Sequence, residues 1–119
     1  MVAKRGLGVM IDWERVQELR SEIGPDSFME VVEMFLEEAD GVAERLAHGV
    51  PEAELEAELH FLKGSALNLG LDQLAGLCQA GERAAAKGQA ETVDTAAVMQ
   101  AYAASKSALL DGLDTATAA

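Results

Sequence analysis

The sequence predicts an all-α protein, folded as an antiparallel up-and-down four-helix bundle with an additional short N-terminal helix. Apolar residues recur at alternating spacings of three and four through most of the 119 residues, which is the period of an amphipathic helix. Alanine is abundant, aromatic residues make up 4% of the chain and there are only two prolines, a composition that favours helices. Glycine or proline marks the short breaks between the apolar stripes, and short turns join antiparallel neighbours in bundles.

The predicted domain covers residues 12–111, between a flexible lead-in at 1–11 and a flexible tail at 112–119. Asp12 is a favourable N-cap for the first, short helix, and Gly24 is a favourable residue just after its end. We expect this short helix to cover one end of the bundle. Its apolar residues are Trp13, Val16, Leu19 and Ile23.

The second helix has a long apolar stripe and acidic residues on its other faces, a pattern typical of a helix with a solvated side. Asp26 or Ser27 can cap its start. Gly49 and Pro51 mark its end and the start of the next helix, because proline suits a first helical position. The stripe consists of Phe28, Val32, Phe35, Ala39, Val42 and Leu46.

Three further helices are expected. They extend from about Pro51 to Leu69, from the cap Asp72 to about Gly88, and from residues 91–94 onwards. Their apolar positions are Leu55, Leu59, Leu62, Ala66 and Leu69 in the third helix, Leu74, Leu77, Cys78, Ala84 and Ala85 in the fourth, and Val98, Tyr102, Ser105 and Leu109 in the fifth.

His60 occupies the solvent side of the third helix. At about 100° per residue it lies roughly 140° from the centre of the apolar sector, so it is not a core histidine. An exposed helix face usually carries charged residues, but the neighbours of His60 are Ala53, Ala57, Gly64 and Leu67. Glycine inside a helix costs about 1 kcal/mol relative to alanine, and close approach of another molecule explains that cost. We call these neighbours the docking face.

Lys63 lies one turn after His60, so the two side chains are neighbours on the helix. Its ammonium would stabilise negative charge placed on the imidazole, whereas Glu56, one turn before His60, acts in the opposite sense. The pair alone is better interpreted as a lysine that solubilises the helix. Asn68 flanks the docking face and completes it, while Ser65 lies nearer the core sector.

Composition excludes several classes of function. Lys and Arg number 9 against 21 Asp and Glu, and the formal charge of −12 repels nucleic acid and anionic membranes. No apolar run approaches a membrane span, and we identify no signal peptide. Cys78 is the only cysteine, which suits a reducing cytoplasm, and its apolar stripe predicts a buried structural thiol. No glycine-rich nucleotide loop is present, so we expect no autonomous kinase activity.

The segment from His60 to Gly70 reads HFLKGSALNLG and resembles the signature of histidine-containing phosphotransfer (HPt) domains, H-x-L-K-G-S-[AS]-x-x-x-G. The resemblance continues through Leu74, Cys78 and Glu82, which match the family's L-x-x-x-C-x-x-x-E. It covers roughly residues 12 to 110.

Two positions depart from the family's pattern. Leu71 stands where the family often has alanine, and Gly81 stands where it often has leucine. Both differences concern packing, and neither involves a residue that would carry chemistry.

The resemblance implies a phosphocarrier rather than an enzyme. His60 would accept a phosphoryl group at Nε2 from the aspartyl phosphate of one receiver domain and pass it to the aspartate of another, while Lys63 would stabilise charge and Gly64 would allow close approach. The implied partners are response-regulator receiver domains and a hybrid sensor histidine kinase. The chain itself needs no cofactor, because Mg²⁺ belongs to the receiver. We expect a cytoplasmic monomer that binds neither nucleic acid nor membrane.

A helical adaptor without phosphoryl chemistry is the alternative, in which the docking face binds a partner and His60 is incidental. His48, near the end of the second helix, is expected to interact with the helix dipole, and no metal site is predicted. The chain is either a free-standing carrier or a piece of a larger protein, and Met1 favours the former.

Overall fold

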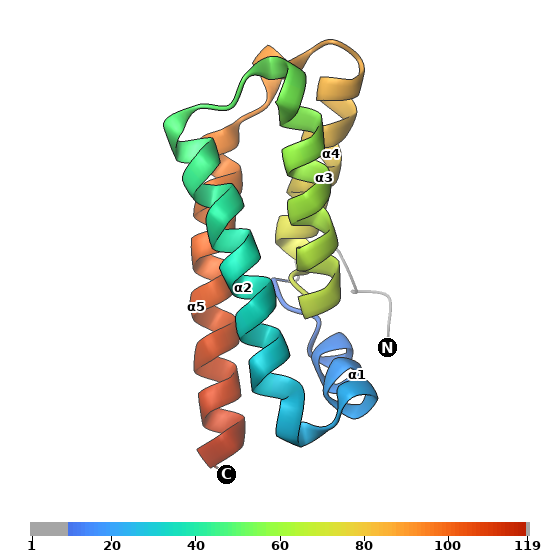
Figure 1. Ribbon diagram of the computed structural model, residues 1–119, viewed down its shortest axis with the longest axis vertical. Coiled ribbons are helices and arrows are strands. Elements are labelled where there is room, and N and C mark those ends of the chain that lie inside the picture. Colours follow the sequence, from blue (N-terminus) through green and yellow to red (C-terminus); the bar gives the residue numbers. More distant parts are fainter. Residues whose placement is uncertain (1–9, 119) are drawn as a thin grey trace.

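The computed structural model describes residues 10–118, with side chains as far as Leu113 (Figure 1). In this part of the chain the helices are α1 (Trp13–Ile23), α2 (Pro25–His48), α3 (Glu52–Leu69), α4 (Asp72–Ala86), the short 3₁₀ helix η1 (Ala90–Thr92) and α5 (Thr95–Ala118). The described residues contain no strand, so the predicted all-α class is confirmed.

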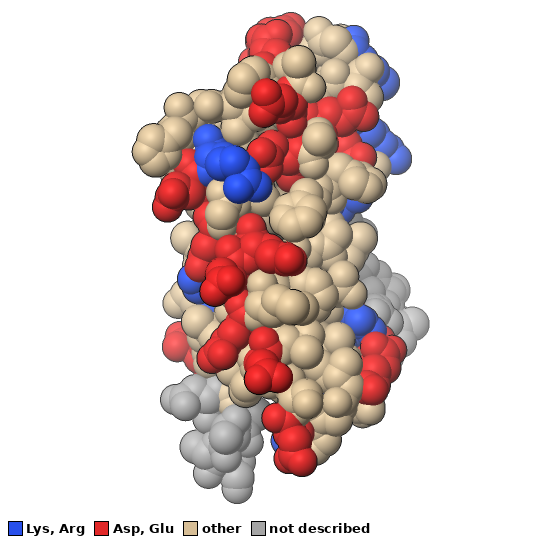
Figure 2. Space-filling view, viewed as in Figure 1, with Lys and Arg blue, Asp and Glu red and all other residues tan. Residues whose placement is uncertain are grey.

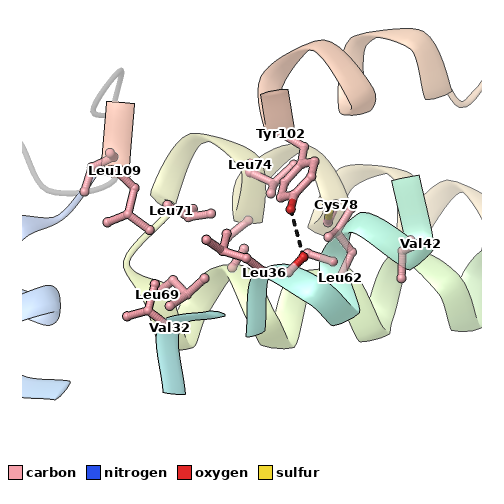
Figure 3. Packing of buried hydrophobic residues seen from close by; sticks show 14 of the residues in the cluster. Val32, Leu36, Val42, Leu62, Leu69, Leu71, Leu74, Cys78, Tyr102 and Leu109 are labelled. Atoms are coloured by element: carbon pink, nitrogen blue, oxygen red, sulfur yellow. Dashed lines mark hydrogen bonds between the residues drawn. The ribbon is translucent and has the colours of Figure 1, made fainter. Parts of the chain in front are cut away.

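The four long helices α2 to α5 alternate in direction along the long axis of the molecule (Figure 1). Each of them packs against two of the others, in the order α2, α3, α4, α5 and back to α2, and the contact between α3 and α4 is the most extensive. The short helix α1 lies at the end where α2 begins and α3 ends, and it contacts both. The core fills the space between these helices (Figure 3).

The predicted apolar positions of α3 and α5 are all buried. In α2 the prediction chose the wrong one of two adjacent residues: Leu36 is buried and Phe35 is only partly buried. The alternating spacing admits either residue, and the packing of α5 over this part of α2 selects Leu36, whose carbonyl accepts a hydrogen bond from the Tyr102 hydroxyl at 3.1 Å (Figure 3).

The buried side of α4 also differs from the prediction. Leu77 is exposed, whereas Ala75 and Gly81 are buried together with Leu74. Small residues face α3 because the two helices lie close together: a Cβ on Gly81 would lie 2.8 Å from Cδ1 of Leu59. Which residues of α4 are buried against α3 therefore depends on their size as well as on their hydrophobicity.

Two of the predicted helix caps are wrong. Helix α2 begins at Pro25 and not after Asp26 or Ser27, because proline is favoured at the first helical position and Gly24 adopts the positive φ that precedes it. Helix α4 begins at Asp72 itself, so Asp72 is not its cap. The cap predicted for α1 is confirmed: a side-chain oxygen of Asp12 accepts hydrogen bonds from the next helical amides.

The chain just before α1 is fixed against the turn between α3 and α4. Ile11, predicted to lie in a loose lead-in, is buried, while residues 1–9 of that segment lie outside the described residues. The backbone N–H of Asp12 donates to the carbonyl of Gly70 at 2.7 Å. Gly70 has φ of 75°, and a Cβ there would lie 2.7 Å from the Asp12 carbonyl oxygen, so this turn requires glycine.

A polar clamp joins α5 to α2. The Tyr102 hydroxyl shares its one hydrogen between the Leu36 carbonyl and a carboxylate oxygen of Asp40 at 2.5 Å, and the Lys106 ammonium lies 3.0 Å from both oxygens of Asp40. Burial acts to raise the pKa of Asp40, but the hydrogen bonds from Tyr102 and Lys106 together with the charge of Lys106 lower it below its usual value. Burial of the Tyr102 hydroxyl raises its pKa, and the hydrogen bond to Asp40 and the negative charge of Asp40 raise it further.

Helix α5 continues beyond the predicted domain boundary at residue 111. It extends through Gly112 to Ala118, and Leu113 is buried, so the start of the predicted tail is part of the packed structure. Gly112 was predicted to belong to the flexible tail, but here its missing side chain makes room for another residue: a Cβ on Gly112 would overlap the indole of Trp13. The contact attaches α1 to α5.

We predict that Gly112→Ala destabilises the protein, although alanine is the better helix former. The added methyl group must displace the Trp13 indole, and overpacking typically costs 1–3 kcal/mol, more than the gain in helix propensity of about 1 kcal/mol. Urea unfolding should show a lower free energy of unfolding. Because Trp13 is the only tryptophan, its fluorescence should shift to longer wavelength as the ring becomes exposed.

Gly41→Ala is the matched control, because a Cβ there meets only Nη1 of Arg45 at an ordinary 3.5 Å. This variant should be as stable as the parent or more stable. Equal stabilisation by both substitutions would mean that the indole does not pack on Gly112.

Candidate functional site

His60 lies in the middle of α3 and points to solvent, as the apolar spacing predicts, with 67% of its side chain exposed. It stands on a convex helix surface rather than in a cavity. A reactant that reaches this side chain must therefore bring its own surface, and the surroundings of the imidazole decide what the ring can do.

Glu82 of α4 holds the imidazole of His60. Its Oε2 lies 2.8 Å from Nδ1 of the ring, although the two residues are 22 positions apart. A carboxylate can only accept hydrogen bonds, so Nδ1 carries the hydrogen in this arrangement. In the neutral ring the lone pair is then on Nε2, and this nitrogen is available to an electrophile.

Lys63 also pairs with Glu82. Its Nζ lies 2.8 Å from Oε1 of Glu82 and donates to Oε1 of Gln79 at 3.0 Å. Only 17% of the lysine side chain is exposed. The interpretation of Lys63 as a residue that merely solubilises the helix is therefore wrong: it packs against α4, where Glu82 lies between it and His60.

The electrostatics keep Glu82 ionised. The hydrogen bond from Lys63 lowers the pKa of Glu82, partial burial opposes this effect, and the hydrogen bond and charge of His60 lower the pKa further. Beneath the cluster, burial and then the charge of Glu82 raise the pKa of Cys78 to about 12. Cys78 is buried, as predicted, and stays a neutral thiol.

Reasoning from the helix pattern missed the two α4 residues of the site. Glu56, one turn from His60, was the carboxylate considered, whereas the contact is made by Glu82 from the neighbouring helix. The only signal for Glu82 was its place in the motif that the chain shares with HPt domains. Gln79 had no signal of its own, although its spacing of three places it on the same face of α4 as Glu82.

The residues of the docking face surround His60 on α3. Ala53, Ala57 and Asn68 are exposed, and Leu67 has 53% of its surface exposed. A Cβ on Gly64 would meet no heavy atom within 4 Å, so nothing in the fold requires glycine there. The side-chain amide of Asn68 donates to the Gly64 carbonyl at 3.0 Å, which directs it along its own helix.

Charge is unevenly distributed around this face. Figure 2 shows acidic side chains gathered over α2 and over the end where α2 and α3 meet, while an uncharged surface continues down the part of α3 beyond them. Between α2 and α3, Arg45 forms a bidentate pair with Glu58 at 2.7 and 2.9 Å. The hydrogen bond raises the pKa of Arg45.

His48 is not part of the site. Its Nδ1 lies 2.9 Å from the carbonyl oxygen of Glu44 at the end of α2, which is the local role predicted for it. Among the described residues, no group of three or more His, Cys, Asp and Glu side chains is arranged to hold a metal ion.

Comparison with known families gives one match. The family model for the Hpt domain matches residues 30–119, which include His60 and the whole cluster around it. Neither the curated proteins nor the solved structures gave a match. In the described part of the chain, no helix has both the length and the hydropathy of a membrane-spanning segment.

We predict that Glu82 fixes the tautomer of His60. At alkaline pH, where imidazole side chains are neutral, ¹⁵N NMR should show the hydrogen on Nδ1. Glu82→Gln should preserve this state because an amide oxygen still accepts the bond, whereas Glu82→Ala should allow both tautomers. Glu56→Ala is the control and should leave the spectrum unchanged. A mixture of tautomers in the parent protein would contradict the prediction.

The lowered pKa of Glu82 also predicts a pH dependence of stability. A carboxyl group whose pKa is lower in the folded state stabilises that state at pH values above its pKa in the unfolded chain. This stabilisation is lost as the pH falls through the pKa of the folded state. The parent should therefore exceed Glu82→Gln in free energy of unfolding at neutral pH. The difference should shrink below pH 4.5, the usual carboxyl value. A difference that is constant down to pH 3 would contradict this.

Proposed function

The chain belongs to the Hpt domain family, and we propose that it relays a phosphoryl group between receiver-domain aspartates through His60. Hpt domains are phosphotransfer modules of two-component signalling that interact with receiver domains and histidine kinases, and they are phosphocarriers rather than enzymes. The observation that carries the proposal is the bond from His60 Nδ1 to Glu82, which leaves Nε2 as an exposed nucleophile.

The transfer step needs no proton to move. The Nε2 lone pair attacks the phosphorus of an aspartyl phosphate, the P–N bond forms, the P–O bond breaks and the aspartate leaves as a carboxylate. The ring keeps its hydrogen on Nδ1 and becomes positively charged, and the Glu82 carboxylate 2.8 Å away stabilises that charge. In the second transfer a receiver carboxylate attacks the phosphorus, and the electron pair returns to Nε2.

Lys63 is proposed to act in two ways. Through its contacts with Glu82 and Gln79 it holds the carboxylate in position against His60. Its positive charge is also proposed to lie beside the transferred phosphoryl group. The oxygens of this group carry more negative charge during transfer than in the encounter complex. The ammonium therefore contributes to the rate of transfer as well as to the position of Glu82.

The partner supplies the remaining groups. We propose that response-regulator receiver domains and a hybrid sensor histidine kinase bind at the docking face, that Mg²⁺ is held by the receiver, and that this chain has no cofactor of its own. The small side chains of Ala53, Ala57 and Gly64 support close approach of a partner to His60. We further propose that α2 to α5 are an antiparallel four-helix bundle with α1 as an additional helix, and that the protein works as a cytoplasmic monomer.

We predict that His60→Gln abolishes phosphorylation without unfolding the protein, because the side chain is exposed and carries no core contact. A receiver domain charged with acetyl phosphate should transfer acid-labile radioactive phosphate to the parent and not to this variant. His48→Gln is the control and should be labelled normally. Label retained in His60→Gln would place the acceptor elsewhere, and receiver binding without labelling of the parent would favour a helical adaptor.

We predict that Lys63→Ala lowers the rate of transfer more than it lowers affinity for the receiver. At saturating receiver, the single-turnover rate should fall by roughly two orders of magnitude, the lower end of the scale for loss of one pre-organised electrostatic group. Lys87→Ala, which removes an exposed lysine at the end of α4, is the control. If Lys63 acted only through Glu82, adding Lys63→Ala to Glu82→Gln would cause no further loss.

A further inference from the structure

Gln79 stands at the far end of a chain of polar contacts that begins at His60. The imidazole contacts Glu82, Glu82 contacts Lys63, and the ammonium of Lys63 donates to Oε1 of Gln79 at 3.0 Å. Because an ammonium can only donate, the Gln79 amide turns its oxygen to Lys63 and its nitrogen away. Any effect of Gln79 on the imidazole through these contacts must therefore pass through Lys63.

Lys63 has two acceptors on α4, and they compete for its ammonium. Nζ lies 2.8 Å from Oε1 of Glu82, a carboxylate oxygen that is buried from water, and 3.0 Å from the amide oxygen of Gln79. Only 17% of the lysine side chain is exposed, so water is a poor replacement for either acceptor. Loss of the amide oxygen would leave the ammonium to Glu82 alone, because a carboxylate is the stronger acceptor for a charged donor.

The strength of the pair between Lys63 and Glu82 determines what Glu82 can offer to His60. The other carboxylate oxygen, Oε2, accepts the hydrogen of Nδ1 at 2.8 Å. A carboxylate that is more fully neutralised at Oε1 is a weaker acceptor at Oε2, because both oxygens share one negative charge. The bond to the neutral ring is then weaker, and the stabilisation of the positively charged phosphorylated ring falls by more.

An amide at position 79 divides the ammonium unequally between the two acceptors. A carboxylate at this position would compete with Glu82 on equal terms and would leave Glu82 with more negative charge facing the imidazole. An apolar side chain would not compete at all. The neutral Gln79 lies between these cases, because it accepts one hydrogen of the ammonium while most of the positive charge stays with Glu82.

We propose that Gln79 is a positioning residue: through Lys63, it sets how strongly Glu82 stabilises the imidazole in its free and phosphorylated states. This inference rests on the proposed function, because it concerns how the phosphoryl group is distributed between this chain and a receiver domain. The bonds that change are those of the proposed transfer. The P–N bond forms at Nε2 as the P–O bond of the aspartyl phosphate breaks, and the hydrogen stays on Nδ1.

The test measures the equilibrium distribution of phosphate between the protein and a receiver domain that labels it. Gln79→Met removes the amide oxygen and should shift the distribution away from the protein by roughly threefold or more, the scale of one neutral hydrogen bond. Gln79→Glu should shift it towards the protein. Gln73→Met and Gln73→Glu, at an exposed position near the start of the same helix, are the matched controls and should leave it unchanged.

Dependence on Lys63 separates a positioning role from a packing role. In a Lys63→Ala background, Gln79→Met should cause no further shift of the equilibrium, because the residue through which it acts is gone. Thermal unfolding should show that every variant folds. Shifts of the same sign for Gln79→Met and Gln79→Glu, no shift in either variant, or an undiminished effect in the Lys63→Ala background would overturn the proposal.

A measurement without phosphate keeps this inference separate from the proposed function. At alkaline pH, where imidazole is neutral and lysine is still charged, ¹⁵N NMR of the unphosphorylated protein reports the tautomer of His60. Gln79→Met should increase the population with the hydrogen on Nε2, whereas Gln79→Glu and Gln73→Met should not. An unchanged population in Gln79→Met would overturn the inference. Failure of every receiver to label the parent protein, with the tautomer shifted as expected, would instead overturn the proposed function and leave the positioning role of Gln79 in place.

Discussion

The packing of α3 against α4 is the constraint on which the site depends. His60 and Lys63 lie on one helix and Glu82 and Gln79 on the other, so every polar contact of the cluster crosses this interface. The close fit of Gly81 to Leu59 fixes the separation of the helices. The glycine turn that follows Leu69 fixes their relative register. If either helix were displaced by one position along its sequence, the imidazole and Glu82 would be rotated apart by about 100° around the helix axis.

Glu82 satisfies two requirements that usually conflict. It must be ionised to hold the Nδ1 hydrogen, and it must be sheltered enough for the bond to keep one geometry. Lys63 resolves the conflict by pairing with Oε1, the buried oxygen of the carboxylate, and its positive charge compensates for that burial. Cys78 below the cluster stays neutral and adds no competing charge.

The sequence predicts the helices and the exposed histidine because both follow from a period that each helix carries within itself. Local spacing determines which side of α3 His60 occupies, and the buried positions of α3 and α5 follow equally well. Contacts between helices are a different matter. The choice of Leu36 over Phe35, the pairing of His60 with Glu82 and the continuation of α5 through Gly112 all depend on neighbouring elements. A glycine is especially ambiguous, since it can end a helix, allow packing or leave space for a partner.

The position of His60 on a convex surface suits the proposed role of a carrier that must serve two partners. In the proposed relay the same atoms receive and release the phosphoryl group. A neighbouring group that stabilises the phosphorylated histidine therefore speeds the first transfer but slows the second. A carboxylate devoted to His60 alone would strongly stabilise the positively charged phosphorylated ring. Glu82 shares its charge with Lys63, which moderates this stabilisation and keeps the two transfers closer in free energy. In the proposed relay, this pairing would therefore fix the tautomer of the ring without trapping the phosphorylated product.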